Sequence, residues 1–93
     1  QDYLQQARRA FWGDDFESAE IAYLALIDEF PADADAFGEL GNLYNAMGRR
    51  AEALDAYYAA GLRLKAAGAA DRLQQVIDIL RKEKDDRVAD LLR

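Results

Sequence analysis

One half of this 93-residue chain repeats in the other at an offset of 34 residues. Four small or aromatic residues recur at that spacing, so that Ala19, Ala22, Tyr23 and Ala25 return as Ala53, Ala56, Tyr57 and Ala59. Tyr3 and Phe37, both aromatic, lie at the same offset. A fixed period of this length is typical of helical repeat arrays, in which each helix buries one apolar stripe against its neighbours. Such arrays present a continuous groove rather than a catalytic pocket, so the period constrains function as well as fold.

The second copy carries the pattern most fully, in the order Phe37, Leu40, Gly41, Tyr44, Gly48, Ala53, Tyr57 and Ala60. This order resembles the tetratricopeptide repeat, whose consensus is W-x2-L-G-x2-Y, a later Gly, then A-x3-F, x2-A and a closing Pro. The first copy is more divergent, with Tyr3, Ala7, Ala10, Ala19, Tyr23, Leu26 and the closing Pro31. It departs from the pattern at Gln6 and Asp14. The resemblance covers residues 1–66.

The resemblance implies an all-α fold: a right-handed helical repeat array, or α-solenoid, of two tetratricopeptide-like helix pairs plus a C-terminal capping helix or degenerate third repeat. Residues 1–93 then form one domain, with a divergent first repeat over 1–33, a second over 34–67 and the cap or third repeat over 68–93. Small residues are expected where two helices cross closely, at Gly41, Ala53 and Ala60. The aromatic residues beside these crossings are expected in the core, namely Phe37, Tyr23, Tyr44 and Tyr57.

Local signals predict helices over 2–12, 16–30, 34–47 and 50–66. The turn Gly13-Asp14-Asp15 offers an Asp to cap the second helix, and Asp33 or Asp35 can cap the third by accepting orphan N–H bonds. Pro31 ends the second helix, and Gly48 supplies the left-handed residue that a tight helix hairpin needs. No proline follows the fourth helix, so Gly68 is expected to end it.

The last third of the chain does not follow the repeat. Leu73, Val76, Ile77 and Leu80 lie on one face of an expected amphipathic fifth helix. Asp85 or Asp86 is expected to cap a short sixth segment through Val88, Leu91 and Leu92. We expect these helices to cap the array, because a terminal repeat otherwise exposes its apolar face. The alternative is that Ile79, Leu91 and Leu92 dock a partner.

Composition excludes several classes of chemistry. The chain contains no His and no Cys, which removes thiol nucleophiles, Cys/His zinc sites and histidine acid–base catalysis. Residues 1–70 hold 6 Lys+Arg against 12 Asp+Glu, whereas residues 71–93 hold 6 of each. This acidic body disfavours binding to nucleic acid or to an anionic membrane surface. No stretch is long and apolar enough for direct membrane insertion, which takes about 20 residues.

The remaining candidate motifs have structural explanations. The acidic turn of Asp14, Asp15 and Glu17 lacks the spacing of a calcium loop, so helix capping is the better interpretation. Ser18 has no His partner anywhere in the chain, which excludes a catalytic triad. Gly38 and Gly41 fall inside an expected helix that follows no strand, so they do not form a phosphate loop. We therefore expect no catalytic residue, no metal and no cofactor.

Function is expected in the concave groove, which the first helix of each pair lines in tetratricopeptide folds. The resemblance places these partner-binding residues there: Leu4, Arg8, Phe11, Trp12, Glu39, Asn42 and Asn45. Gly38 lies among them, and Arg72, Val76 and Ile79 extend the set if the fifth helix stacks in register. The asparagines suit hydrogen bonds to an extended peptide, and Phe11 with Trp12 offers an aromatic anchor. For Trp12 the alternative is packing against the following turn.

One subset of the family binds C-terminal carboxylates through basic residues and asparagine in the groove. The matching positions here hold Leu4, Arg8, Glu39, Ala69 and Leu73. Only Arg8 has the required charge, so this carboxylate-binding function does not transfer.

These features predict a non-catalytic protein–protein interaction scaffold that binds a peptide or a partner protein in its groove. The alternative is a structural module that forms homo-oligomers by end-to-end stacking, whereas an enzyme is disfavoured by the lack of convergent catalytic groups. The runs 38–43 and 56–61 also resemble bacterial repeat modules attached to inner-membrane anchors, for example in Pel-type exopolysaccharide secretion.

The compartment is left open by composition, because a Cys-free domain suits the cytoplasm and the periplasm equally. The chain begins with Gln1 rather than Met, and we interpret it as an excised or processed fragment. That interpretation leaves room for a preceding signal peptide, further repeats or an inner-membrane anchor.

Overall fold

The computed structural model describes residues 2–93, and this range contains six helices and no strand. The predicted all-α class is therefore confirmed. The helices are α1 (Tyr3–Trp12), α2 (Phe16–Glu29), α3 (Ala34–Ala46), α4 (Arg50–Ala66), α5 (Ala70–Lys82) and α6 (Val88–Leu91). The predicted bounds of the first four helices differ from these by a single residue at most at either end.

Side-chain caps explain why α1, α2 and α3 begin where they do. Asp15 precedes α2 and accepts a hydrogen bond from the backbone N–H of Ser18 at 3.2 Å. Asp33, rather than Asp35, caps α3, because its carboxylate accepts from two backbone N–H groups of the first turn. Asp2 caps α1 in the same way. Each cap satisfies donors that a helix start leaves unpaired.

Left-handed residues follow four of the helices, including Lys84 with φ of 57° in the turn after α5. Gly48 and Gly68, with φ of 75° and 69°, lie in the turns after α3 and α4, as the sequence predicts. In the turn after α1 the left-handed residue is Asp14, with φ of 61°, although Gly13 precedes it. Asp is among the few residues that tolerate this conformation, because its short side chain can hydrogen-bond locally.

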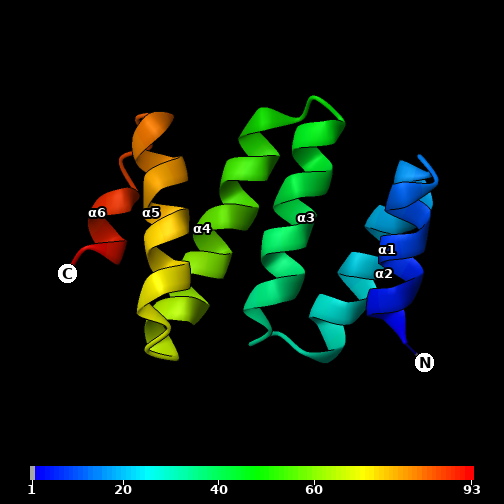
Figure 1. Cartoon of the computed structure of the whole chain (residues 1–93), viewed down its shortest axis with the longest axis horizontal. Coiled ribbons are helices and arrows are strands. Elements are labelled where there is room, and N and C mark those ends of the chain that lie inside the picture. Colours follow the sequence, from blue (N-terminus) through cyan, green and yellow to red (C-terminus); the bar gives the residue numbers. More distant parts are fainter. Residues whose placement is uncertain (1) are drawn as a thin grey trace.

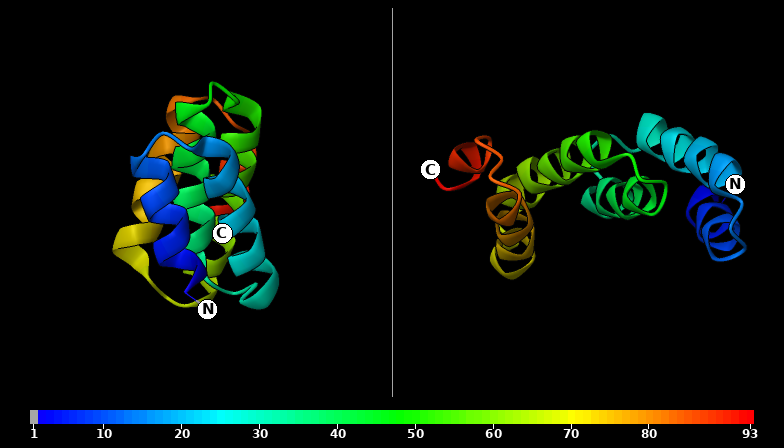
Figure 2. Two further views of the ribbon diagram at one scale, coloured as in Figure 1. Left: turned by 90° about the vertical axis from the view of Figure 1, so that its right-hand side faces the viewer. Right: turned by 90° about the horizontal axis from the view of Figure 1, so that it is seen from above.

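The helices stand side by side in chain order, from α1 and α2 at one end to α6 at the other (Figure 1). Successive helices contact one another along the whole chain, and α4 also contacts α6. Seen from above, α1, α3 and α5 lie along one side, and α2, α4 and α6 lie along the other (Figure 2). We call these the odd layer and the even layer. The molecule is consequently elongated, with extents of 36 × 26 × 19 Å.

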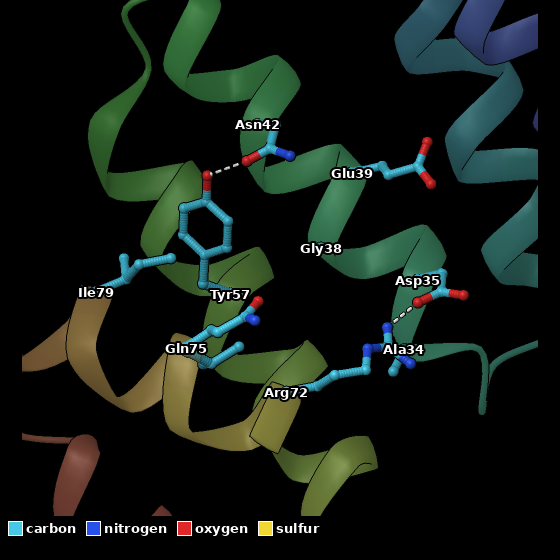
Figure 3. Close-up of a pocket in the computed structure, with 10 residues that line it drawn as sticks. Ala34, Asp35, Gly38, Glu39, Asn42, Tyr57, Arg72, Gln75 and Ile79 are labelled. Carbon is cyan, nitrogen blue, oxygen red and sulfur yellow. Dashed lines mark hydrogen bonds and ion pairs between the residues drawn. The ribbon is translucent and has the colours of Figure 1, made fainter. Parts of the chain in front are cut away.

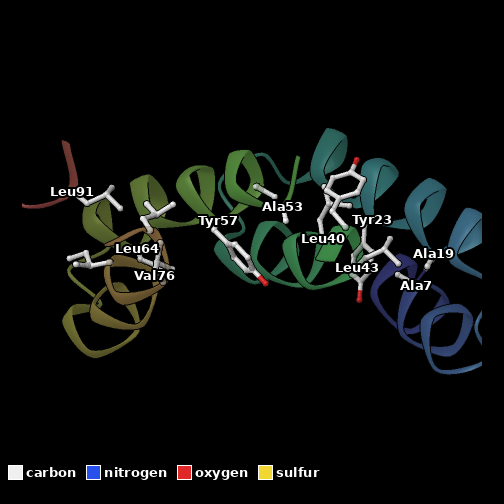
Figure 4. Packing of buried hydrophobic residues seen from close by; sticks show 14 of the residues in the cluster. Ala7, Ala19, Tyr23, Leu40, Leu43, Ala53, Tyr57, Leu64, Val76 and Leu91 are labelled. Carbon is white, nitrogen blue, oxygen red and sulfur yellow. The ribbon is translucent and has the colours of Figure 1, made fainter. Parts of the chain in front are cut away.

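Small residues allow the helices to cross closely in the core (Figure 4). Ala7, Ala19 and Ala53 are completely buried. A Cβ atom added to Gly41 would lie 2.7 Å from the ring of Tyr57, closer than real side chains approach. The expectation that Gly41 and Ala53 mark helix crossings is thus supported by the packing.

Three tyrosines fill the core and bond to neighbouring helices through their hydroxyl groups. Tyr23, Tyr44 and Tyr57 are buried, as predicted, with at most 8% of their surface exposed. The Tyr23 hydroxyl donates to Glu39 at 3.0 Å, and the Tyr44 hydroxyl donates to Glu20 at 2.8 Å. Each of these two bonds joins α2 to α3. Because a buried hydroxyl without a partner is costly, the bonds fix the register of the two helices as well as adding stability.

The C-terminal helices α5 and α6 pack against α4, the last helix of the second pair. α5 buries Val76, Ile77 and Leu80, and Leu91 of α6 is 3% exposed and packs where Gly61 leaves room on α4. The predicted cap by Asp85 or Asp86 is wrong in position: Arg87 is the residue before α6, and no side chain caps that helix. Asp85 instead accepts from the backbone N–H of Arg87 at 3.0 Å, just ahead of the helix.

Candidate functional site

A groove of about 240 Å³ opens in the odd layer between α3 and α5 (Figure 3). One wall comes from α3, the opposite wall comes from α5, and Tyr57 of α4 lies between them. The lining residues are Ala34, Asp35, Gly38, Glu39, Asn42, Tyr57, Arg72, Gln75, Val76 and Ile79. We call this the α3–α5 groove. It combines an apolar side, from Val76 and Ile79, with several polar groups at its edges.

The Tyr57 hydroxyl organises the polar groups at one end of the groove. It donates to Oδ1 of Asn42 at 2.5 Å and accepts from Nδ2 of Asn45 at 3.1 Å. Asn45 in turn accepts from the Arg50 guanidinium through Oδ1. Burial raises the pKa of the Tyr57 hydroxyl, so it remains a neutral donor. These bonds hold the Asn42 side chain with its oxygen engaged and its NH₂ group beside the groove.

Gly38 leaves an open space in the wall of the groove. A Cβ atom placed on this residue would meet no atom within 4 Å, and its backbone is not left-handed. Neither packing nor backbone geometry therefore requires glycine here, although glycine inside a helix costs about 0.5–1 kcal/mol relative to alanine. What the glycine does provide is access to the backbone of α3.

Ion pairs lie along the edge of the groove. The Arg72 guanidinium on α5 pairs with the Asp35 carboxylate on α3, across its mouth. Glu39 forms a bidentate pair with Arg8, with nitrogen–oxygen distances of 2.9 and 2.6 Å. Their side chains are 24% and 33% exposed, and the Glu39 carboxylate raises the pKa of Arg8. The Arg8–Glu39 pair joins α1 to α3, while the Arg72–Asp35 pair joins α3 to α5.

The structure brings only part of the predicted site together. Glu39 and Asn42 line the groove, as do four positions expected beside them, Gly38, Arg72, Val76 and Ile79. Asn45 lies next to this set rather than in it, since both ends of its amide are engaged within the protein. Arg8 and Glu39 also form an ion pair with each other, while both side chains remain partly exposed.

The predicted residues of α1 do not line the α3–α5 groove. Leu4 is half-buried against the core, and Phe11 packs edge-to-face on Phe16 with ring centroids 5.7 Å apart. Both are therefore committed to packing rather than to an exposed anchor. Trp12, in contrast, is 77% exposed, so the alternative of packing against the following turn is wrong. It lies at the C-terminal end of α1, outside the set of groove residues.

Sequence reasoning missed four residues of the groove, namely Ala34, Asp35, Tyr57 and Gln75. Tyr57 was expected only in the core, yet its ring is buried while its hydroxyl reaches the groove. Gln75 precedes Val76 and comes from α5, whose register against α3 is not encoded in the repeat. The available signal for Gln75 is its position 3 residues after Arg72 and 4 residues before Ile79. Because Arg72 lies 4 residues before Val76, this spacing places all four on one side of α5.

The groove offers both hydrogen-bonding and apolar contacts. Within residues 2–93, no cluster of acidic side chains is arranged to hold a metal ion. Over the same residues, no helix has the length and apolar character needed to cross a bilayer. Comparison with family models, with curated proteins and with solved structures finds no match for this chain. The resemblances to tetratricopeptide repeats and to exopolysaccharide-secretion modules therefore stay predictions.

Proposed function

We propose that this chain is a tetratricopeptide-like repeat module that binds an extended segment of a partner protein in the α3–α5 groove. It acts without catalysis, as a scaffold that holds its partner. The two helix pairs are α1–α2 and α3–α4, and α5 with α6 forms the cap or degenerate third repeat.

Two surface hollows support the repeat architecture. One, of about 260 Å³, lies on the α3–α4 pair and is lined by Phe37, Leu40, Tyr44, Glu52, Asp55, Ala56 and Ala59. The other, of about 280 Å³, lies on the α1–α2 pair and is lined by Tyr3, Gln6, Ala10, Ser18, Ile21, Ala22 and Ala25. Every residue of the second set is 34 positions before its counterpart in the first. The same surface shape thus recurs with the period of the sequence, as expected of a repeat array.

Gly38 is the observation that carries the binding proposal. The chain retains a helix-weakening residue where nothing in the fold needs it, and the resulting space opens into the groove. Glycine at such a position is used where another backbone or a ligand approaches closely. An extended peptide backbone is narrow enough to lie against Gly38 between the two helix walls.

The other groove residues define the chemistry of the peptide. The NH₂ group of Asn42 can donate to a peptide carbonyl, while Tyr57 holds its oxygen in place. Val76 and Ile79 suit a small apolar side chain of the peptide, because burial of apolar area is the main source of affinity in such sites. Asp35 and Arg72 can each exchange their mutual ion pair for one with the partner, since both are about half exposed.

Selection of peptides followed by calorimetry tests this proposal. A library of linear peptides is panned on the domain, and the affinity of the best binder is measured for variant domains. Gly38→Leu fills the groove and is expected to weaken binding at least tenfold. Ala46→Leu, which adds a leucine at an exposed position of the same helix, should leave the affinity unchanged. Equal affinity for the wild type and Gly38→Leu would remove the groove as the binding site.

A second candidate function is self-assembly by end-to-end stacking. The observation that favours it is the exposure of large apolar side chains near both ends, with Ile21 at 66% and Leu92 at 54%. Sedimentation over a range of concentrations tests it: a module that stacks should form larger species as the concentration rises. In that case Leu92→Asp should restore the monomer, and a protein that stays monomeric throughout would exclude this function.

A further inference from the structure

The α1–α2 pair presents a hollow surface that no helix of this chain covers. Its lining includes Ile21, which is 66% exposed, and the small residues Ala22 and Ala25. We call this the α1–α2 face. It shares no residue with the α3–α5 groove, and so a ligand of one does not occupy the other.

The matching face of the α3–α4 pair shows how such a surface is used. There α2 lies against α3 beside the hollow, and Glu20 of α2 bonds to Tyr44, one of the residues that line it. Glu20 accepts a hydrogen bond from the Tyr44 hydroxyl at 2.8 Å and pairs with the Arg49 guanidinium at 3.3 Å. Farther along, the Arg63 guanidinium donates to the carbonyl oxygen of Pro31 at 2.8 Å. Two arginines of the receiving pair therefore meet acceptors on the incoming segment.

The α1–α2 face carries the opposite charge at both of those positions. Counting back 34 residues, Arg49 corresponds to Asp15 and Arg63 corresponds to Glu29, both of which are exposed. Asp15 and Arg49 also have nearly the same backbone geometry at the start of their helices, with φ/ψ of −90°/74° and −97°/72°. The two parts of the chain also differ in their overall charge. Residues 1–34 contain 8 Asp+Glu and 2 Lys+Arg, whereas residues 35–93 contain 10 of each, so the first pair carries the entire charge of −6.

We propose that the α1–α2 face docks an amphipathic helix of a partner protein, with an apolar stripe over Ala22 and Ala25 and basic residues along its edge. The helix lies against α1 as α2 lies against α3. A Lys or Arg takes the place of Glu20 and meets Asp15, and a second cation meets Glu29. Complementary charge of this kind selects the partner and rejects acidic helices.

A second copy of this chain fits the face poorly. Stacking would bring α6 onto it, but α6 has only 4 residues, whereas the hollow runs from Ser18 to Ala25 along α2. The acidic residue of α6, Asp90, is already bound to the Tyr58 hydroxyl at 2.8 Å. α6 is therefore too short for the face, and the basic residues that flank it, Arg87 and Arg93, already form ion pairs within the chain.

The test uses this chain's own second helix as the probe. A peptide of residues 14–32 is made in its natural form and as the Glu20→Lys form, each with a side-chain bridge between positions 18 and 22. Circular dichroism confirms that both are helical before use, because short helices are marginal in water. Binding to the full chain is measured by fluorescence anisotropy at 50 and 300 mM salt.

The proposal expects the Glu20→Lys peptide to bind at least tenfold more tightly than the natural peptide at low salt, with the difference shrinking at high salt. Asp15→Arg on the domain should reverse the preference, since Arg49 forms an ion pair with Glu20 at the corresponding place. That substitution removes the α2 cap, so its fold is checked by circular dichroism, and Glu29→Arg provides a second variant that leaves the cap intact. Asp86→Arg changes the net charge equally at the other end of the chain and should leave the preference intact.

Four results would overturn the proposal. The first is equal binding of the two peptides, and the second is no binding of either up to 1 mM. The third is the same loss of preference from Asp86→Arg as from Glu29→Arg, which would mean that net charge alone decides the affinity. Sedimentation of the domain without peptide tests whether a second copy of the chain occupies the face. A dimer that Glu29→Arg abolishes would assign the face to a second copy and would also contradict the proposal.

Discussion

Two glycines of α3, one turn apart, have opposite roles. Gly41 lies against the Tyr57 ring, where an added Cβ atom would be 2.7 Å from the nearest carbon. Tyr57 cannot move away easily, because its hydroxyl bonds to both Asn42 and Asn45. Gly38 has nothing within 4 Å of its missing Cβ atom. One glycine therefore serves the packing of α3 on α4, and the other keeps the groove open.

These roles predict opposite effects of the same substitution. Gly41→Ala should lower the free energy of unfolding by about 1–3 kcal/mol, because it overpacks a close helix crossing. Gly38→Ala should raise it by up to about 1 kcal/mol, because alanine is the better helix former. Urea denaturation followed by circular dichroism measures both. A Gly41→Ala protein as stable as the wild type would mean that the α3–α4 contact is wrong.

The buried tyrosines make stability sensitive to alkaline pH. Burial and the hydrogen bond to Glu20 raise the pKa of Tyr44 to about 12, from an ordinary value of 10.0. Burial also raises the pKa of Tyr23, which bonds to Glu39. A raised pKa in the folded state means that the unfolded chain loses its proton first. The stabilisation from Tyr44 is thus complete below pH 10 and is lost as the pH rises towards 12.

Thermal melts across this range test the tyrosine contribution. The melting temperature of the wild type should fall between pH 10 and about pH 12. Tyr44→Phe should be less stable at pH 7, by about 0.5–1.5 kcal/mol for one lost hydrogen bond, but its decline with pH should be shallower. Identical slopes for the two proteins would show that Tyr44 does not contribute to the alkaline loss.

At the scale of elements, the helix ends were predictable and the contacts between helices were not. Asp15, Asp33, Gly48 and Gly68 act on their own neighbours in the chain, so their effects can be read locally. The Arg8–Glu39 pair joins residues 31 positions apart, and no local pattern identifies it. The sequence predicts only that Arg8 and Glu39 contact a partner, and their pairing with each other becomes visible in the structure.

Two leucines near the C-terminus differ in burial, and their substitution should therefore have different effects on stability. Leu80 is completely buried beneath α5, while Leu92, just after α6, is 54% exposed. Leu80→Ala should reduce the free energy of unfolding by about 2–5 kcal/mol, the range for a cavity in a packed core. Leu92→Ala should change it by no more than about 0.5 kcal/mol. Denaturation curves of the two variants test whether α5 buries its apolar face against α4. An equal loss of stability in the two variants would contradict that packing.

At the scale of the whole molecule, the 34-residue period predicted more than the composition did. The period anticipated the order of the helices and the small residues at their crossings, such as Gly41 and Ala53. It did not locate the groove fully, because α5 follows no repeat and its wall depends on how it packs against α4. The recurrence of one hollow at the same spacing became visible only in three dimensions.

The central claim is that the α3–α5 groove binds an extended peptide. The most direct measurement is a titration of the ¹⁵N-labelled domain with the best panned peptide, followed by amide chemical shifts in two-dimensional NMR spectra. The largest shifts should fall on Gly38, Asn42, Gln75 and Ile79, including the side-chain NH₂ of Asn42. Shifts confined to the even layer, around Ile21 and Leu62, or spread evenly over the chain would contradict it.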